Sequence, residues 1–263
     1  MEKEIIYLYC VTDKTPALKD IAHLTNKLRP ISYNGLYAIA GKVKKDEFSV
    51  QALSKNLANL RWIKAKANLH EKVIEGIMKK GSVIPFKFPT LFNSEDNLKK
   101  MLKKHAQKFQ VHLKGLAGKE EWGIKIYCDM DKLRKALIRE DKESLNIDKE
   151  INASTPGKAY FLKKKKLGFL DTSARKKISE YGQDSFDSLS RQSVKAQINK
   201  LLPKEVTERE DDMVLNSAFL VDKKRIKEFI KIVYNLNSKY KDKGLEFNCT
   251  GPWPPYNFCE KDE

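Results

Sequence analysis

A run of seven residues near the N-terminus, Ile5-Ile6-Tyr7-Leu8-Tyr9-Cys10-Val11, consists only of β-branched, aromatic and other apolar residues. Successive side chains of a strand point to opposite faces of a sheet. A run without any polar position therefore predicts a strand that is buried on both faces. Such a strand lies in the interior of its sheet, so the run predicts a sheet-based N-terminal domain.

The next elements follow from turn residues and from changes of period. Residues 17–28 predict a short helix that stops before Pro30, and Asn34-Gly35 predicts a hairpin-type turn before a strand over 36–40. The remaining expected elements are a helical stretch over 49–80 closed by Gly81, an extended segment 83–89, a helix 95–116 and a strand 122–128.

Two details of these elements carry specific expectations. Pro85 and Pro89 lack the backbone N–H of a strand ladder, so segment 83–89 is expected beside a bulge or only partly paired. Ser94 precedes Glu95 and Asp96, a pattern typical of a capped helix N-terminus. The element order resembles the split β-α-β repeat of a ferredoxin-like sandwich, with helices on one face and one extra helix before the last strand.

The C-terminal half predicts a second, helix-rich α+β domain. Polar residues 141–156 are expected to form a linker. The expected elements are helices over 157–181 and 186–201, a strand over 213–221, a helix over 222–240 and a strand over 245–250. The predicted organisation is a ferredoxin-like domain 1–140, the linker 141–156, an α+β domain 157–249 and a tail 250–263.

Charge and targeting signals restrict the protein classes. With 52 Lys and Arg against 35 Asp and Glu, the formal net charge is +17, which attracts anionic partners or reflects a lysine-rich solvated surface. Met1 is followed by charged residues and a strand-like run, and no stretch approaches the roughly 18 apolar residues of a membrane helix. We expect a cytoplasmic protein without membrane contact, in which Cys10 and Cys128 are buried thiols.

Catalytic motifs are missing from the sequence. His70-Glu71 matches half of a zinc-protease motif, but Ile74 stands where the second histidine would be needed. No phosphate-binding glycine loop or G-x-S-x-G motif occurs. We therefore expect no enzymatic activity, no cofactor and no metal.

Nucleic acid is the alternative partner class. Tyr7, Tyr9, Phe86 and Phe88 would form a base-stacking platform if they were exposed on a sheet, although core packing is the simpler expectation. The run Lys163–Lys166 would bind phosphate, or form a solvated helix face that pairs with the acidic stretch 205–212. An RNA- or anionic-surface-binding module is the second functional hypothesis.

The most distinctive segment is Thr250-Gly251-Pro252-Trp253-Pro254-Pro255-Tyr256-Asn257-Phe258, whose prolines favour rigid extended or turn structure. This segment resembles the TGPWPPYxF ending of the gas vesicle accessory proteins of the GvpL/GvpF family. Further blocks are similar to that family in the same order. They are Tyr7-Leu8-Tyr9, the block from His70 to Glu75, the block from Gly81 to Phe92, Glu121 to Ile126, Gly157 to Leu162, and Ala218 to Asp222.

The resemblance implies a non-enzymatic protein of gas vesicle assembly that engages the small hydrophobic shell protein and other accessory proteins. It also implies a ferredoxin-like domain joined to a helical α+β domain. Lys87 and Pro89 depart from the family's Arg and Gly, which changes the donors and the backbone freedom there. The candidate partner-binding residues are Phe86, Lys87, Phe88, Trp253, Tyr256 and Phe258.

Overall fold

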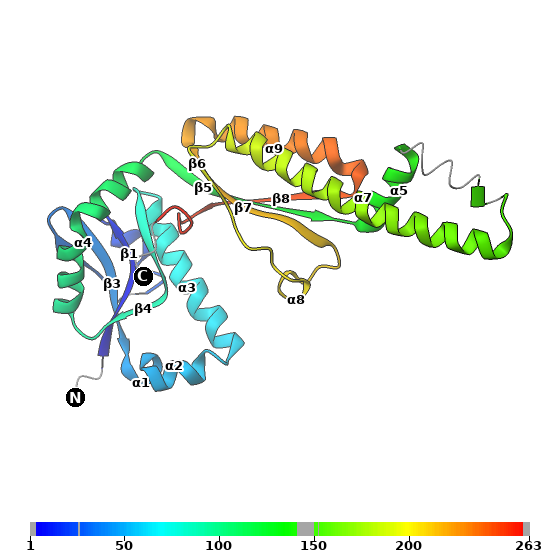
Figure 1. Cartoon of the computed structure of the whole chain (residues 1–263). Helices are drawn as coiled ribbons and strands as arrows, with labels where there is room; N and C mark the ends of the chain where they lie inside the picture. The colour runs from blue at the N-terminus through cyan, green and yellow to red at the C-terminus, as the bar shows by residue number, and fades with distance from the viewer. Residues whose placement is uncertain (1–3, 26, 141–149, 152, 260–263) are drawn as a thin grey trace. The chain divides into compact units, whose positions relative to one another are not determined.

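The computed structural model describes residues 4–25, 27–140, 150–151 and 153–259 (Figure 1). The chain divides into two compact units. The first unit comprises Met1–Glu121 together with Pro252–Glu263, and the second comprises Trp122–Gly251. Both units contain a four-stranded sheet and helices, so the expected two-domain α+β class is confirmed.

The sheet of the first unit has the order β2-β3-β1-β4. Its strands are β1 (Glu4–Thr12), β2 (Leu28–Tyr33), β3 (Leu36–Lys44) and β4 (Val83–Phe92). β1 pairs antiparallel with both β3 and β4, which confirms that the apolar N-terminal run is an interior strand. This strand order is that of the split β-α-β repeat.

Helices cover both faces of this sheet (Figure 1). Ile6 and Leu8 pack in one core with helix α4 (Glu95–Leu116). Ile5 and Tyr7 pack in a second core with helix α3 (Leu60–Met78). The expectation of helices on one face was wrong for this unit, because a strand that is apolar on both sides needs a cover on each side.

The edge strand β2 was not predicted. Residues Leu18–Ile21 form only one 3₁₀ turn, η1, and the chain then enters β2. Pro30 lies within β2, where its missing N–H is tolerated because an edge strand has only one neighbour. Asn34 and Gly35 adopt φ values of 46° and 77° between the paired residues Tyr33 and Leu36, which confirms the two-residue hairpin turn.

The helices of the first unit follow the predicted pattern. The stretch 49–80 forms α2 (Val50–Asn56) and α3, preceded by the short α1 (Lys45–Phe48). Ser94 caps α4 as expected, since its hydroxyl accepts a hydrogen bond from the backbone N–H of Asn97 at 3.3 Å.

The sheet of the second unit has the order β6-β7-β5-β8. Its strands are β5 (Lys119–Cys128), β6 (Lys195–Ile198), β7 (Asp212–Asp222) and β8 (Leu245–Trp253). The helices are α5 (Met130–Glu140), α7 (Pro156–Ser190), α8 (Lys204–Thr207) and α9 (Ile226–Tyr240), with 3₁₀ turns η2 (Lys223–Arg225) and η3 (Lys241–Lys243).

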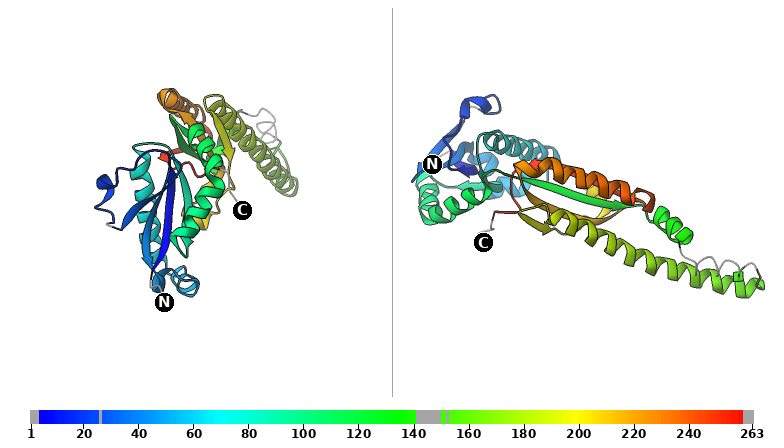
Figure 2. Two further views of the ribbon diagram at one scale, coloured as in Figure 1. Left: turned by 90° about the vertical axis from the view of Figure 1, so that its left-hand side faces the viewer. Right: turned by 90° about the horizontal axis from the view of Figure 1, so that it is seen from above.

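The long helix α7 and the helix α9 lie side by side on one face of this sheet (Figures 1 and 2). Ile124 and Ile126 of β5 share a core with Leu189 of α7 and Phe229 of α9. The second unit thus combines the split β-α-β strand order with helices on one face, which is the arrangement that the sequence predicted for the N-terminal domain.

Three predicted boundaries therefore change. Strand 122–128 belongs to the second unit, because its apolar face packs against α7 and α9. The two helices predicted over 157–181 and 186–201 are one helix, α7, followed by the strand β6. Most of the predicted linker, residues 141–149 and 152, lies outside the described residues, and Pro156 already begins α7.

Candidate functional site

A bulge interrupts the pairing of β4 with β1. Leu8 pairs with Thr90 and Cys10 pairs with Pro85, so Tyr9 alone stands opposite the segment Phe86–Pro89. The prediction of a bulge beside Pro85 and Pro89 is confirmed. A bulge leaves backbone carbonyls without a strand partner, and these need other donors.

Two side chains supply those donors. The hydroxyl of Thr90 donates to the carbonyl of Lys87 at 2.7 Å. Nε2 of His70 on α3 donates to the carbonyl of Phe86 at 2.9 Å, since a carbonyl can only accept. His70 thus supplies the hydrogen bond that a strand partner would otherwise make to Phe86. Of the His70-Glu71 pair, the histidine therefore has a structural role.

The hydrogen bond to Phe86 also determines the tautomer of His70, and with it the role of the other ring nitrogen. Nδ1 carries no proton in this tautomer and accepts from the Tyr7 hydroxyl at 2.8 Å. Burial lowers the pKa of His70 to about 4, although the bond to Phe86 opposes this shift. His70 is therefore a neutral, buried imidazole at neutral pH, wedged among the rings of Tyr7, Tyr9 and Phe88.

The C-terminal segment 254–259 closes over this region of the first unit. The hydroxyl of Tyr256 donates to Oε1 of Glu71, the neighbour of His70, at 2.8 Å. Burial raises the pKa of Glu71, the bond from Tyr256 lowers it, and the charge of Glu75 raises it further. The net pKa lies above the usual range of a glutamate.

A second glutamate holds the same segment. The backbone N–H of Asn257 donates to Oε2 of Glu121 at 3.1 Å, and its side-chain amide donates to Oε1 at 2.6 Å. Glu121 is only 3% exposed, and burial raises its pKa to about 7 against the two bonds from Asn257. We call Glu71, Glu121, Tyr256 and Asn257 the C-terminal clasp.

The six predicted partner-binding residues lie in different surroundings. Phe86 and Phe88 are partly buried and pack on opposite faces of the first sheet, Phe86 edge-on to Phe109 and Phe88 near Trp62. Lys87 between them is exposed. Tyr256 and Phe258 are partly buried, while Trp253 is 42% exposed.

Sequence reasoning missed Glu121 and Asn257 as a pair. The two residues are 136 positions apart, so no local spacing links them. The predicted aromatic platform is not available to stacked bases, because Tyr7 and Tyr9 are 2% and 6% exposed. The acidic stretch 205–212 forms ion pairs with its own neighbourhood, where Arg209 pairs with Asp211 and Lys204 pairs with Asp212.

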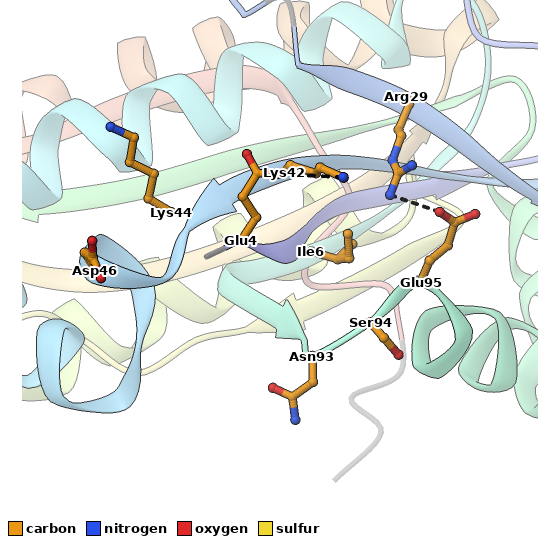
Figure 3. Close-up of a pocket in the computed structure, with 9 residues that line it drawn as sticks. All are labelled: Glu4, Ile6, Arg29, Lys42, Lys44, Asp46, Asn93, Ser94 and Glu95. Atoms are coloured by element: carbon orange, nitrogen blue, oxygen red, sulfur yellow. Dashed lines mark ion pairs between the residues drawn. The ribbon is translucent and has the colours of Figure 1, made fainter. Parts of the chain in front are cut away.

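A wide hollow lies at the end of the first sheet where β1 begins (Figure 3). Arg29 pairs with Glu95 at 3.0 Å, and Lys42 pairs with Glu4 at 3.6 Å. Three cationic and three anionic side chains line it, so the hollow has no net charge to recruit an ion. The lining residues are Glu4, Ile6, Arg29, Lys42, Lys44, Asp46, Asn93, Ser94 and Glu95.

No group of three or more His, Cys, Asp or Glu among the described residues is placed to hold a metal ion. Within those residues, no helix combines the length and apolarity needed to cross a bilayer. Cys10 and Cys128 are buried free thiols, as expected.

Exposed apolar side chains gather instead on the first half of α7. Tyr160, Phe161 and Leu167 are 66%, 74% and 61% exposed. Residues 156–170 contain five lysines and no acidic residue. Large exposed apolar side chains on one element mark interaction surfaces, and we call this segment the α7 patch.

Comparison with known proteins identifies the family. The model of the family "Gas vesicle synthesis protein GvpL/GvpF" matches residues 5–260. Gas vesicle protein L of Streptomyces sp. (strain CB03234) is 23% identical over 231 residues, which are 88% of this chain and 82% of the relative. Gas vesicle protein L1 of Halobacterium salinarum is 23% identical over 262 residues, 96% of this chain and 89% of the relative.

Solved structures show the same fold. GvpF from Anabaena sp. PCC7120 superposes with a TM-score of 0.68 at 17% identity, over 99% of this chain and 98% of that chain. GvpF from Microcystis aeruginosa superposes with a TM-score of 0.67 at 18% identity, over 98% of this chain and 99% of that chain. The family match spans nearly the whole sequence, and the chain therefore belongs to the GvpL/GvpF family of proteins of gas vesicle formation.

Proposed function

We propose that this protein acts in gas vesicle assembly as a non-catalytic binding protein whose partners are the small shell protein and other accessory proteins. Family membership supports the role in gas vesicle assembly. The α7 patch is the observation that supports the binding of a partner protein. A small hydrophobic shell subunit would need an apolar surface on its carrier, at the gas vesicle or at its nucleation site.

The chemistry of the α7 patch suits such a partner. Tyr160, Lys164 and Leu167 are four and three residues apart, so they share one helical face. The rings of Tyr160 and Phe161 pack edge to face, with their centroids 6.2 Å apart. Aromatic side chains bury a large area at low entropic cost, while the adjacent lysines speed encounter with acidic groups.

The C-terminal clasp is proposed to support a second contact. It fixes the chain directly after Trp253, so the exposed indole is held by a rigid Pro-Pro-Tyr-Asn segment. Preorganised aromatic anchors bind with less loss of entropy than mobile ones. Trp253 and Lys87 are the two residues of the predicted set that are exposed enough to contact a partner directly.

The test is co-precipitation with co-expressed shell protein. The double variant Tyr160→Ser/Phe161→Ser should lose most of the captured shell protein. The control Val50→Ser/Leu60→Ser removes two apolar side chains of the first unit that are 87% and 81% exposed, and this variant should capture as much shell protein as the wild type does. Equal capture by both double variants would refute the assignment to the α7 patch.

A further inference from the structure

A small pocket opens on the α3 face of the first sheet, and no residue of the α7 patch or of the C-terminal clasp lines it. Tyr7, Tyr9 and Phe48 form its floor and are almost fully buried. Leu28, Leu69 and Phe88 are partly buried and form its walls. The floor is rigid, because His70 behind it bonds to Tyr7 and stacks on Tyr9 with ring centroids 5.5 Å apart.

The size of the pocket limits its occupant. Its volume is about 240 Å³. Pockets for cofactors and drug-sized ligands have volumes of about 300 to 1,000 Å³. A smaller pocket with apolar walls suits one large side chain, and single aromatic anchors in such pockets dominate the affinity of many protein interfaces.

The rim of the pocket is cationic. Lys27, Lys42, Lys44 and Lys66 line it with one acidic residue, Glu47. Lys66 pairs with Glu47 at 2.6 Å, and Lys42 pairs with Glu4 at 3.6 Å. Among the described residues, Lys27 and Lys44 form no ion pair within 4.0 Å, so two cations beside an apolar hole are available to an anionic partner.

We infer that this pocket binds an acidic segment of a partner protein, with one aromatic side chain in the hole and carboxylates against Lys27 and Lys44. The apolar walls favour an aromatic side chain, and the lysines favour acidic residues beside it in the partner sequence. This site lies in a different unit from the α7 patch and does not depend on the proposed capture of the shell protein.

Gly41 of β3 offers a way to block the pocket without disturbing the fold. A Cβ atom at this position would lie 3.6 Å from the Lys27 carbonyl and from the Tyr9 ring, and 3.9 Å from Leu28. These are ordinary van der Waals distances to residues that line the pocket. Valine favours strands, so Gly41→Val should fill part of the hole and keep the sheet intact.

The experiment measures fluorescence anisotropy with the labelled probe peptide Asp-Glu-Phe-Glu-Asp and the full-length protein. The expected result is saturable binding that weakens about tenfold when alanine replaces the phenylalanine of the probe. Gly41→Val should weaken it to a similar extent, whereas Gly115→Val, placed in open space on α4, should bind as the wild type does.

The rim is tested with a charge-matched pair. Lys27→Ser/Lys44→Ser should weaken binding several-fold at low salt and reduce its salt dependence. Lys103→Ser/Lys104→Ser removes the same charge from exposed positions of α4 outside the pocket and should have little effect. The inference is overturned if the probe does not bind saturably, if the two lysine pairs behave alike, or if an RNA oligonucleotide displaces the probe.

Discussion

Asn257 donates two hydrogen bonds to the buried carboxylate of Glu121, a residue 136 positions earlier in the chain. Each carboxylate oxygen accepts one bond, so the side chain of Glu121 is held in a fixed orientation. Tyr256 next to Asn257 is held by Glu71 in the same way. The proline-rich end of the chain is therefore part of the first unit, and its role in the structure can be tested separately from its role in binding.

Glu121→Gln should change the pH dependence of stability. Burial raises the pKa of Glu121 from 4.5 to about 7. The folded state holds this proton more tightly, so the stabilisation is fully present below pH 4.5 and is lost as the pH rises to 7. The unfolding free energy of the variant minus that of the wild type should rise across this window, by up to about 1.4 kcal/mol per pH unit. A flat difference in urea titrations would contradict the buried, protonated carboxyl.

For His70→Gln, the difference in unfolding free energy between the variant and the wild type should change with pH in the opposite direction. Burial lowers the pKa of His70 from 6.5 to about 4, so the wild type loses stability as the pH falls from 6.5 towards 4. Glutamine cannot titrate, yet its amide can donate to Phe86 and accept from Tyr7. The variant should therefore gain stability relative to the wild type as the pH falls, and the same urea titrations at pH 7, 6, 5 and 4 measure it. A difference that grows with rising pH would show the imidazole to be charged.

Tyr256→Phe should destabilise the first unit by roughly 1–3 kcal/mol, because it leaves the half-buried Glu71 without its donor. Thermal and urea unfolding give the size of the effect. Tyr234→Phe removes a hydroxyl from a side chain that is 69% exposed and should leave stability nearly unchanged. Equal stability of the two variants would mean that the clasp does not hold the C-terminal segment.

Trp253→Ala should weaken capture of partner proteins and lower stability by less than Tyr256→Phe does, because the indole is 42% exposed. Calorimetry and co-precipitation of the same preparation separate the two effects. A drop in stability as large as that of Tyr256→Phe would assign Trp253 to packing instead.

Gly76→Ala should destabilise the first unit by about 1–3 kcal/mol. A Cβ at Gly76 of α3 would lie 2.3 Å from Cγ2 of Ile21, which is buried and has little room to move. Gly168→Ala on α7 is the matched helical control, since nothing lies within 4 Å of a Cβ there. That variant should gain about 0.5–1 kcal/mol from helix propensity. Urea unfolding of both variants decides the matter, and similar changes in both would contradict the close α3–η1 packing.

The parts of the fold that sequence predicted correctly depend on local signals. The cap at Ser94, the Asn34-Gly35 turn and the apolar run of β1 each specify their structure within a few residues. The errors concern long-range partners. Strand 122–128 has the same pattern whichever sheet it joins, and only its packing against α7 and α9 assigns it to the second unit.

The candidate site also combines features that have a local sequence signal with features that depend on long-range partners. The bulge at Pro85 and Pro89 could be predicted because proline removes a specific backbone donor. The edge strand around Pro30 was missed because Pro30 was interpreted only as the end of a helix. Proline is also tolerated in an edge strand, where no neighbour needs the missing donor. Neither the Glu121–Asn257 pair nor the pocket between β3 and α3 has a local signal, because each is assembled from residues far apart in the chain.

The most direct test of the proposed function is a pulldown of the tagged wild-type protein from cells that make gas vesicles, treated with nuclease and washed at raised salt. If the proposed function is right, the shell protein and other accessory proteins are recovered after both treatments. Recovery of nucleic acid alone, lost at high salt, would refute the proposed function and would show that the net charge of +17 determines what this protein binds.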